Sequence, residues 1–429
     1  MRSAQVARQL MYASPDRAGF SASALEHASS IVEQALDRVF PAAVVLIARH
    51  GLVVYHRAYG YFDPEQRQQP TPKDSLFDVA SLTKLFTTTA FMRLVEAGYV
   101  GLDQPVAEIL PEFGGRRPIG GTEDPLAKVP LPVEDTYAGR EVDASAVTFR
   151  HLLTHTSGLA AWRSVYLQNP TEQAISVRDF SPGQVIPQER ATRIAAIYKY
   201  DFAYPTAAKV VYSDLGLIIL GEAIARLAGK PLELALREWV LEPLRLKDTG
   251  FTPPLSLASR IAPTEICAWR QRRLRGEVHD ENAAGLGGVA GHAGLFTTAW
   301  DVAVLGQLYL NGGTYGDAAL LTPVTVAEMT REQVAWEEMR RGLGWMLKAR
   351  QGASCGSFFS DDSYGHTGFT GTSLWIDPRR DLLVVVMTNR VYYGRDVEGI
   401  LRLRPAFHDA VIQAIEGDYH GAHGGTIDH

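Results

Sequence analysis

Cysteine is scarce in this sequence, because its 429 residues contain only Cys267 and Cys355. Two cysteines cannot supply a four-cysteine zinc site or a framework of several disulfides. Such low cysteine use is typical of proteins that work in a reducing compartment. We therefore expect no structural metal, no metal at the functional site and no cofactor.

Long apolar runs are also absent. No stretch reaches the roughly 20 consecutive apolar residues that a membrane-spanning helix needs. The first twenty residues, MRSAQVARQLMYASPDRAGF, lack the apolar core of a secretory signal peptide. We therefore expect a cytoplasmic protein with no membrane-spanning segment.

Charge of one sign is not in large excess, since 42 basic residues face 48 acidic ones and the formal net charge is −6. This balance offers no general attraction for nucleic acid or for an anionic membrane. The short basic cluster that follows Trp269 is succeeded at once by acidic residues, which is typical of a solvated turn. We expect a small-molecule substrate and neither a nucleic-acid nor a membrane partner, and the sequence leaves the oligomeric state open.

The ends of the chain carry the strand signals. Residues 24–40 have helical periodicity, and the next twenty residues form two β-rich runs hinged at His50-Gly51. Strand-like runs return around a turn at Asp377-Pro378, and a helical pattern covers residues 406–417. The segment 114–144 is dense in Gly, Pro and charge, which predicts a loop.

This distribution predicts an α/β (α+β) fold in which both chain ends build one antiparallel sheet flanked by helices. A mostly helical domain would be inserted between them, with the active cleft at the junction. The expected boundaries are 20–75 with 290–417 for the α/β domain, 76–289 for the helical domain, and 418–429 for a disordered tail.

A possible nucleophile lies in the stretch DVASLTKLFTTTAF, residues 78–91, which we interpret as the start of a helix. Ser81 and Lys84 are three residues apart, so they share one helical face with their Cβ atoms roughly 5–6 Å apart. A hydroxyl and a possible base would then meet. The Ser-x-x-Lys spacing alone is a weak pattern, because a serine that caps the helix and a solvated lysine would give the same spacing.

A serine and lysine pair also needs a proton shuttle for the leaving group and donors for the developing oxyanion. Two further stretches offer polar groups for these tasks. KVVYSDLG contains Tyr212-Ser213-Asp214, and GHTGFTG contains His366-Thr367-Gly368. The segment 285–294, GLGGVAGHAG, adds a flexible glycine-rich loop.

In this order the motifs resemble those of the serine β-lactamase and penicillin-binding protein superfamily, in the branch of class C β-lactamases, DD-peptidases and family VIII carboxylesterases. The resemblance runs from about residue 40 to residue 414 and implies a β-lactamase/transpeptidase-like fold. It implies Ser81 as the nucleophile that forms an acyl-serine, with Lys84 and Tyr212 sharing the proton transfers. The main-chain N–H groups of Ser81 and Phe369 would form the oxyanion hole. The implied substrate-binding residues are Asp214, His366, Thr367 and Gly368.

The sequence departs from the family pattern at two of these positions. Asp214 stands where asparagine is usual, and an ionised carboxylate accepts hydrogen bonds but cannot donate them. His366 replaces a lysine and weakens the permanent positive charge opposite a substrate carboxylate. Both departures favour ester chemistry over β-lactam or peptide recognition, so we expect a carboxylesterase on small esters. The alternatives are a β-lactamase, a DD-peptidase or penicillin-binding protein, and a sensor that binds β-lactams or muropeptides and stays acylated without turnover.

The proton transfers require a lysine that can lose its proton. A free lysine holds its proton at neutral pH, so we expect burial to lower the pKa of Lys84. Whether Lys84 or Tyr212 is the general base stays open at this point.

Rival sites are present in the sequence. Ser354 in GASCG matches Gly-x-Ser-x-Gly, but turn formers follow it where that motif requires a helix. Tyr309-Leu310-Asn311 matches Tyr-x-Asn by its letters, but it closes a helical run as an ordinary stop. His155 and His292 lie in turn-rich segments, and we expect both to be structural.

An aromatic segment precedes the Tyr212 motif, with rings at every second position. We expect these rings to pack against the helical domain, and the alternative is that they line an acyl pocket. The four residues are Tyr198, Tyr200, Phe202 and Tyr204.

Overall fold

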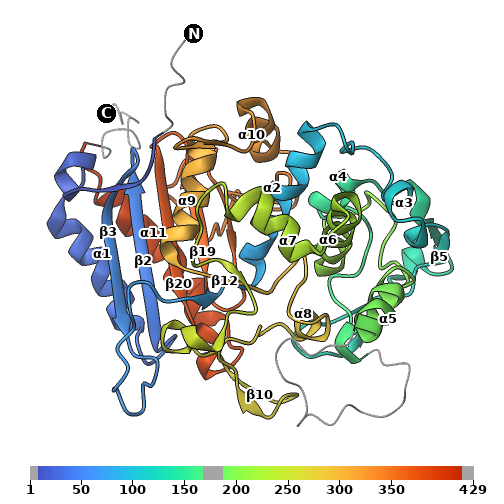
Figure 1. The fold of residues 1–429 in the computed structure, drawn as a ribbon, viewed down its shortest axis with the longest axis horizontal. Helices are drawn as coiled ribbons and strands as arrows, with labels where there is room; N and C mark the ends of the chain where they lie inside the picture. The colour runs from blue at the N-terminus through green and yellow to red at the C-terminus, as the bar shows by residue number, and fades with distance from the viewer. Residues whose placement is uncertain (1–7, 168–186, 418–429) are drawn as a thin grey trace, which may run out of the picture.

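The computed structural model describes residues 8–167 and 187–417 (Figure 1). The predicted disordered tail, 418–429, lies outside the described residues. Among the described helices, none is both long enough and apolar enough to cross a membrane.

The main sheet joins the two ends of the chain, as predicted. It has nine strands in the order β1-β3-β2-β20-β19-β18-β17-β16-β15, and neighbouring strands are antiparallel except β1 and β3. The strands are β1 (Met11–Tyr12), β3 (Leu52–Gly60), β2 (Ala42–Arg49), β20 (Leu382–Thr388), β19 (Ser373–Asp377), β18 (Tyr364–Thr367), β17 (Met346–Leu347), β16 (Met339–Arg341) and β15 (Val334–Trp336).

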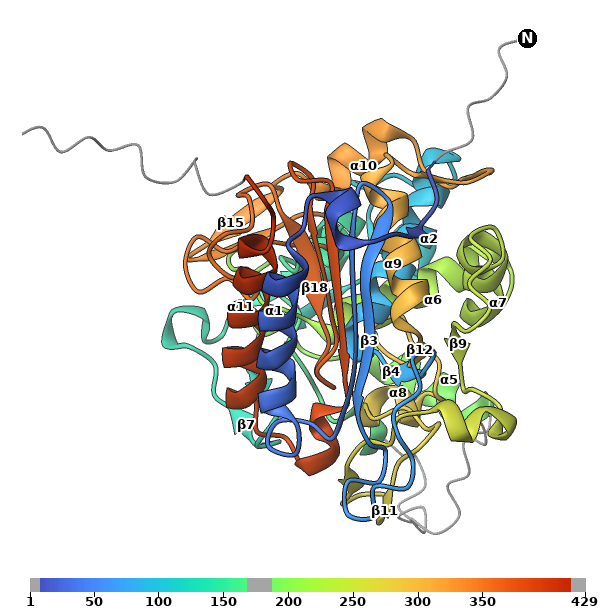
Figure 2. The same ribbon diagram turned by 90° about the vertical axis from the view of Figure 1, so that its left-hand side faces the viewer.

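Helices cover both faces of this sheet, which is the reason its central strands are continuous apolar runs. Along β2, Val44 and Leu46 belong to one core cluster, whereas Val45 and Ile47 belong to the other, as the period of two requires. Helices α1 and α11 lie side by side on one face, and α9 packs on the other (Figure 2). The described α-helices are α1 (Ala22–Ala35), α2 (Thr83–Glu96), α3 (Val106–Ile109), α4 (Phe149–Leu153), α5 (Pro187–Ile197), α6 (Asp214–Ala228), α7 (Leu232–Leu236), α8 (Glu281–Gly285), α9 (Ala299–Leu310), α10 (Pro323–Thr330) and α11 (Glu398–Gln413).

Helix α2 is the central helix and packs against α6 and α7. It starts later than the expected Ser81, because a 3₁₀ turn, η2 (Ala80–Leu82), precedes it. Leu82 is the N-cap residue of α2 and makes no side-chain capping bond. The Ser81 hydroxyl is therefore not used as a helix cap, and the capping interpretation of Ser81 is wrong.

Short strands form the smaller sheets. The predicted loop 114–144 contains two antiparallel pairs, β5 with β8 and β6 with β7. They were not expected because segments of two or three residues give no measurable period of two. The division of the chain at residues 76 and 289 stays a prediction. The remaining strands are β4 (Phe77–Asp78), β5 (Arg116–Pro118), β6 (Thr122–Glu123), β7 (Pro130–Leu131), β8 (Glu141–Asp143), β9 (Gly250–Phe251), β10 (Ile266–Cys267), β11 (Arg272–Arg273), β12 (Leu295–Thr297), β13 (Thr314–Tyr315) and β14 (Ala318–Ala319).

Candidate active site

Ser81 lies in a constrained turn between β4 and α2. The carboxylate of Asp78 accepts hydrogen bonds from the main-chain N–H groups of Ala80, at 2.9 Å, and His279, at 2.6 Å. Ala80 has a φ of 46°, in the left-handed region that costs a residue with a Cβ on the order of 1 kcal/mol or more. The buried carboxylate of Asp78 thus holds the backbone in the conformation that presents Ser81.

The ammonium of Lys84 has a hydrogen-bond acceptor for each of its three protons. Lys84 Nζ donates to Ser81 Oγ at 2.8 Å, to Asp214 Oδ1 at 2.7 Å and to the main-chain oxygen of His292 at 3.0 Å. The lysine side chain is only 1% exposed. The predicted contact between Ser81 and Lys84 is present, and Asp214 is held on the other side of the same ammonium.

The pKa of Lys84 does not follow the expectation from its burial. Burial by itself lowers this pKa, but the negative charge of Asp214 and the hydroxyl of Tyr212 outweigh burial and raise it. The expected lowering was wrong because it omitted a carboxylate in direct contact with the ammonium. Lys84 is therefore a cation at neutral pH.

Tyr212 completes the cluster around Ser81. Its ring centroid lies 4.9 Å from Lys84 Nζ, and the ring of His155 packs on it at 4.6 Å. Burial raises the pKa of the Tyr212 phenol, and the nearby charge of Lys84 offsets part of that increase. His155 Nδ1 accepts a hydrogen bond from the Ser213 N–H at 3.1 Å, so this histidine supports the Tyr212 segment, consistent with the structural role expected of it.

The third motif lies at the end of β18. His366 is buried, and its Nδ1–H donates a hydrogen bond to the main-chain oxygen of Thr367 at 2.9 Å. Burial, with the nearby positive charges of Lys84 and Arg341, lowers the pKa of His366 well below its usual range. The imidazole is therefore neutral at pH 7.

Glycine is required at position 368 because the chain passes very close to the segment before Ser81. A Cβ at Gly368 would lie 2.4 Å from the main-chain oxygen of Val79 and 2.1 Å from Thr372 Oγ1. The hydroxyl of Thr372 donates to that same Val79 oxygen at 3.0 Å, and Thr370 donates to the Asp78 oxygen at 2.7 Å. These bonds join the loop after β18 to the turn that carries Ser81.

Two main-chain donors beside this junction have no protein acceptor. Within residues 8–167 and 187–417, no group accepts a hydrogen bond from the N–H of Ser81 or from that of Phe369. A pair of unused N–H groups beside a hydroxyl nucleophile is the arrangement that an oxyanion hole needs.

These motifs line one cavity of about 290 Å³, which also contains three arginines that the sequence analysis did not single out. Arg404 could have been noticed, because it interrupts the apolar, core-facing side of α11. Arg341 and Arg390 gave no such signal. The lining residues are Ser81, Tyr212, Arg341, Met346, His366, Thr367, Gly368, Phe369, Arg390, Val397, Ile400, Leu401 and Arg404.

The rival sites lie elsewhere. Ser354 is in a coil between β17 and β18, with no helix after it, and its hydroxyl accepts a hydrogen bond from Trp375 Nε1 at 3.1 Å. Tyr309 is in α9, and its hydroxyl contacts Thr89 Oγ1 at 2.8 Å. Neither residue lines the cavity of Ser81.

The aromatic segment does not contribute to this cavity either. Tyr198 and Phe202 are buried in the larger core cluster, and Tyr200 and Tyr204 pack against it. The packing of these rings in the core is confirmed, and their assignment to a separate helical domain stays a prediction.

One group of side chains near the site has the composition of a metal site. Single ligand atoms of Asp214, Asp280 and His292 lie within 4.8 Å of one another. However, Lys84 Nζ already contacts Asp214, and His292 Nε2 lies 3.0 Å from Asp280 Oδ1. Because the ammonium supplies the positive charge here, we derive no metal chemistry from this group.

Comparisons with known proteins find relatives along most of the chain. The chain is 30% identical over 404 residues to a protein of Escherichia coli (strain K12) named "Putative D-alanyl-D-alanine carboxypeptidase", with 89% of this chain and 86% of that protein covered. A protein of Salmonella agona with the same name is also 30% identical, over 409 residues.

Solved structures share the fold at lower identity. EstCE1, a hydrolase with promiscuous acyltransferase activity, is 23% identical with a TM-score of 0.65, covering 91% of this chain and 98% of that one. A penicillin-binding protein homologue from Caulobacter crescentus is 22% identical with a TM-score of 0.66, covering 91% and 99%. The family model named Beta-lactamase matches residues 28–406. The chain, with its serine and tyrosine in one cavity and its lysine in contact with that serine, therefore belongs to the beta-lactamase family of serine hydrolases.

Proposed function

We propose that the protein is a carboxylesterase that hydrolyses small esters through an acyl-Ser81 intermediate. The observation that carries this proposal is the 2.8 Å contact between Lys84 Nζ and Ser81 Oγ. It lies in a cavity where the N–H groups of Ser81 and Phe369 are unused. Nucleophile, proton carrier and oxyanion donors are the groups that acyl transfer requires.

The proton transfers follow from the charges of the free site. Ser81 Oγ attacks the ester carbon, and its proton must go to a base, but the ammonium of Lys84 has no lone pair to accept it. Asp214 Oδ1, at 2.7 Å, is positioned to take one proton from Lys84 Nζ, which can then accept the Ser81 proton. Tyr212 gives its proton to the departing alkoxide and regains one from Lys84. In the second half of the reaction, water attacks the acyl-serine, and these proton transfers run in reverse.

The cavity also favours a substrate with a carboxylate. Arg341 is 6% exposed, and its guanidinium carbon lies 5.4 Å from the centroid of the Tyr212 ring. In the part of the chain that the structure describes, Arg341 forms no ion pair with a carboxylate. A buried cation without a partner is costly unless a ligand supplies the opposite charge. Arg341 would then provide the positive charge that the neutral His366 lacks.

This unpaired cation also supports a second candidate, a DD-carboxypeptidase. A peptide ending in D-alanine has a free carboxylate near the bond that is cleaved. The name of the Escherichia coli relative points to the same activity. Parallel assays with p-nitrophenyl butyrate, a chromogenic cephalosporin and a D-Ala-D-Ala peptide would rank the activities, and faster turnover of the peptide or the cephalosporin than of the ester would contradict our order.

Arg341→Met is expected to reduce kcat/KM selectively for anionic esters. Loss of a hydrogen bond to a charged group costs about 1.5–3 kcal/mol, which corresponds to a decrease of roughly 10- to 100-fold. The measurement compares p-nitrophenyl hydrogen glutarate with the neutral p-nitrophenyl butyrate on both enzymes. An equal decrease for both esters would show that Arg341 does not recognise a carboxylate.

Asp214→Asn is expected to lower the pKa of Lys84 and to remove the carboxylate that takes its proton in the proposed mechanism. Asp214 raises the pKa of Lys84 against the effect of burial, so its removal allows burial to lower that pKa, and Lys84 loses its proton at lower pH. The new amide can also donate to a β-lactam, so the ratio of cephalosporin to ester hydrolysis should rise. Titration of the Lys84 ammonium by NMR in both proteins, together with the ratio of the two hydrolysis rates, provides the measurement. An unchanged Lys84 pKa would show that Asp214 does not control it.

A further inference from the structure

We propose that Arg404 is a positioning residue of the oxyanion hole, which orients and polarises the peptide group that carries the Phe369 N–H. The inference rests on the proposed acyl-Ser81 chemistry and extends it to a residue on the opposite side of the loop. Arg404 comes from α11, more than thirty residues after Phe369 in the sequence.

The contacts of Arg404 converge on the loop after β18. Arg404 Nη2 donates to the main-chain oxygen of Gly368 at 3.1 Å and to that of Thr372 at 2.7 Å. The Gly368 N–H also donates to the Thr372 oxygen, at 2.7 Å. One guanidinium nitrogen therefore binds both ends of the loop 368–372.

The bond to Gly368 matters because of the geometry of the peptide group. The Gly368 carbonyl and the Phe369 N–H belong to one planar trans peptide, so they point in opposite directions. No cis peptide bond is present among the described residues. A cation at the carbonyl oxygen fixes the direction of the N–H and draws electron density away from it. Hydrogen bonds in such a chain strengthen one another, so the Phe369 N–H becomes a better donor to an oxyanion.

The next peptide group is held in the same way. Arg390 Nε donates to the main-chain oxygen of Phe369 at 3.1 Å, and Arg390 Nη2 also contacts this oxygen. Thr370 and Thr372 join the loop to the segment before Ser81. If Arg404 is lost, these other bonds should keep the loop folded, while the Gly368–Phe369 peptide loses its charged partner.

A purely structural role explains Arg404 poorly. It is 4% exposed, and in the described part of the chain it forms no ion pair with a carboxylate, while its Nε has no acceptor. Burial lowers the pKa of Arg404, and repulsion from the nearby Arg390 lowers it further. Burying an unpaired cation is unfavourable, and an apolar residue would fill the same space at lower cost. Stabilisation of the negative charge of a tetrahedral intermediate compensates for this cost during the reaction.

The test uses Arg404→Ala and Arg404→Lys with p-nitrophenyl butyrate and with butylboronic acid, whose serine adduct places an oxygen in the oxyanion hole. For Arg404→Ala we expect kcat to fall about 10- to 100-fold, somewhat less than the ~10²–10³-fold loss on removing an oxyanion donor outright. Boronate affinity should fall with it and KM should change little. Added guanidinium ion should restore part of kcat, and Arg404→Lys should be intermediate.

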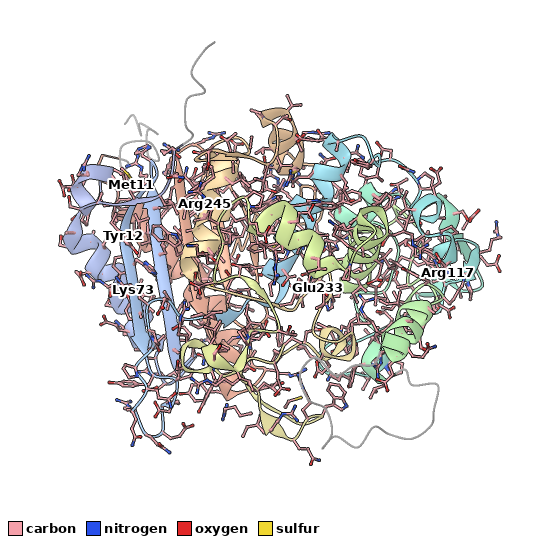
Figure 3. The ribbon with its side chains drawn as sticks, viewed as in Figure 1. Met11, Tyr12, Lys73, Arg117, Glu233 and Arg245 are labelled. Atoms are coloured by element: carbon pink, nitrogen blue, oxygen red, sulfur yellow. The ribbon has the colours of Figure 1, made fainter. Side chains whose placement is uncertain are left out.

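Arg117→Ala is the matched control. Arg117 is likewise a buried arginine that binds main-chain oxygens, those of Phe113, Tyr198 and Tyr200. It lies at the end of the molecule opposite the main sheet (Figure 3). Its loss should reduce thermal stability without changing kcat, boronate affinity or the response to guanidinium.

Three results would overturn the inference. In the first, Arg404→Ala keeps the wild-type kcat and boronate affinity. In the second, it loses activity only in proportion to its loss of thermal stability, as expected for Arg117→Ala. In the third, only its KM for the anionic ester rises, which would make Arg404 a substrate-binding residue. Failure of the proposed function is distinguishable, because it would appear as absent ester turnover in the wild type. Boronate binding, measured by calorimetry, would still report on the oxyanion hole in the wild type and in Arg404→Ala.

Discussion

Ser81→Ala is expected to abolish ester turnover and covalent labelling by a fluorophosphonate. Ser81 Oγ accepts a hydrogen bond from Lys84 Nζ at 2.8 Å, and removal of this nucleophile leaves only the weak catalysis of the oxyanion hole. The expected loss is thus a factor of about 10³ or more. Intact mass spectra after incubation with the fluorophosphonate, together with initial rates on p-nitrophenyl butyrate, provide the measurement.

Ser354→Ala is the matched control for this prediction. Ser354 belongs to the Gly-x-Ser-x-Gly stretch, and its hydroxyl accepts a hydrogen bond from Trp375 rather than from a base. This variant should keep both labelling and turnover. If it is the inactive one, the nucleophile has been misassigned.

The same mass spectra separate an enzyme from a sensor. An esterase releases its acyl group and returns to the mass of the free protein once the substrate is consumed. A sensor would stop after one equivalent and keep the added mass. Persistent acylation by a simple ester would therefore contradict the proposed turnover while leaving Ser81 as the nucleophile.

Lys84→Ala and Tyr212→Phe are each expected to lower kcat by about 10²-fold or more, the scale for loss of a positioned proton carrier. Without Lys84, Ser81 Oγ loses the ammonium that contacts it at 2.8 Å and that also contacts Asp214. Without the Tyr212 hydroxyl the departing alkoxide has no adjacent donor. Single-turnover kinetics, which follow acylation apart from product release, are the measurement.

Two controls accompany these variants. Lys84→Ala leaves Asp214 without its ion-pair partner, so the double variant Lys84→Ala/Asp214→Asn separates a loss of stability from a loss of chemistry. Tyr309→Phe changes a buried tyrosine outside the cavity, and it should retain wild-type kinetics. A correctly folded Tyr212→Phe enzyme with a normal rate would remove Tyr212 from the mechanism.

The sequence by itself determined the elements whose signals are local. The apolar run of β2 and the periodicity of α1 were visible because burial of a strand or of a helix face leaves a pattern within a few residues. The contact between Ser81 and Lys84 was predictable for the same reason, since a spacing of three places two side chains on one side of a helical turn. The order of the motifs was sufficient to indicate the family.

Only the tertiary structure decided the charges at the site. Asp214 is 130 residues from Lys84 in the sequence, yet it lies 2.7 Å from the ammonium and reverses the pKa shift that burial alone predicts. Arg341 and Arg404 reach the cavity from β16 and α11, and only the packing of these distant segments brings them into the cavity of Ser81. The sign of a buried group's pKa shift depends on the distances to its charged neighbours, and those distances exist only after the distant segments have packed together.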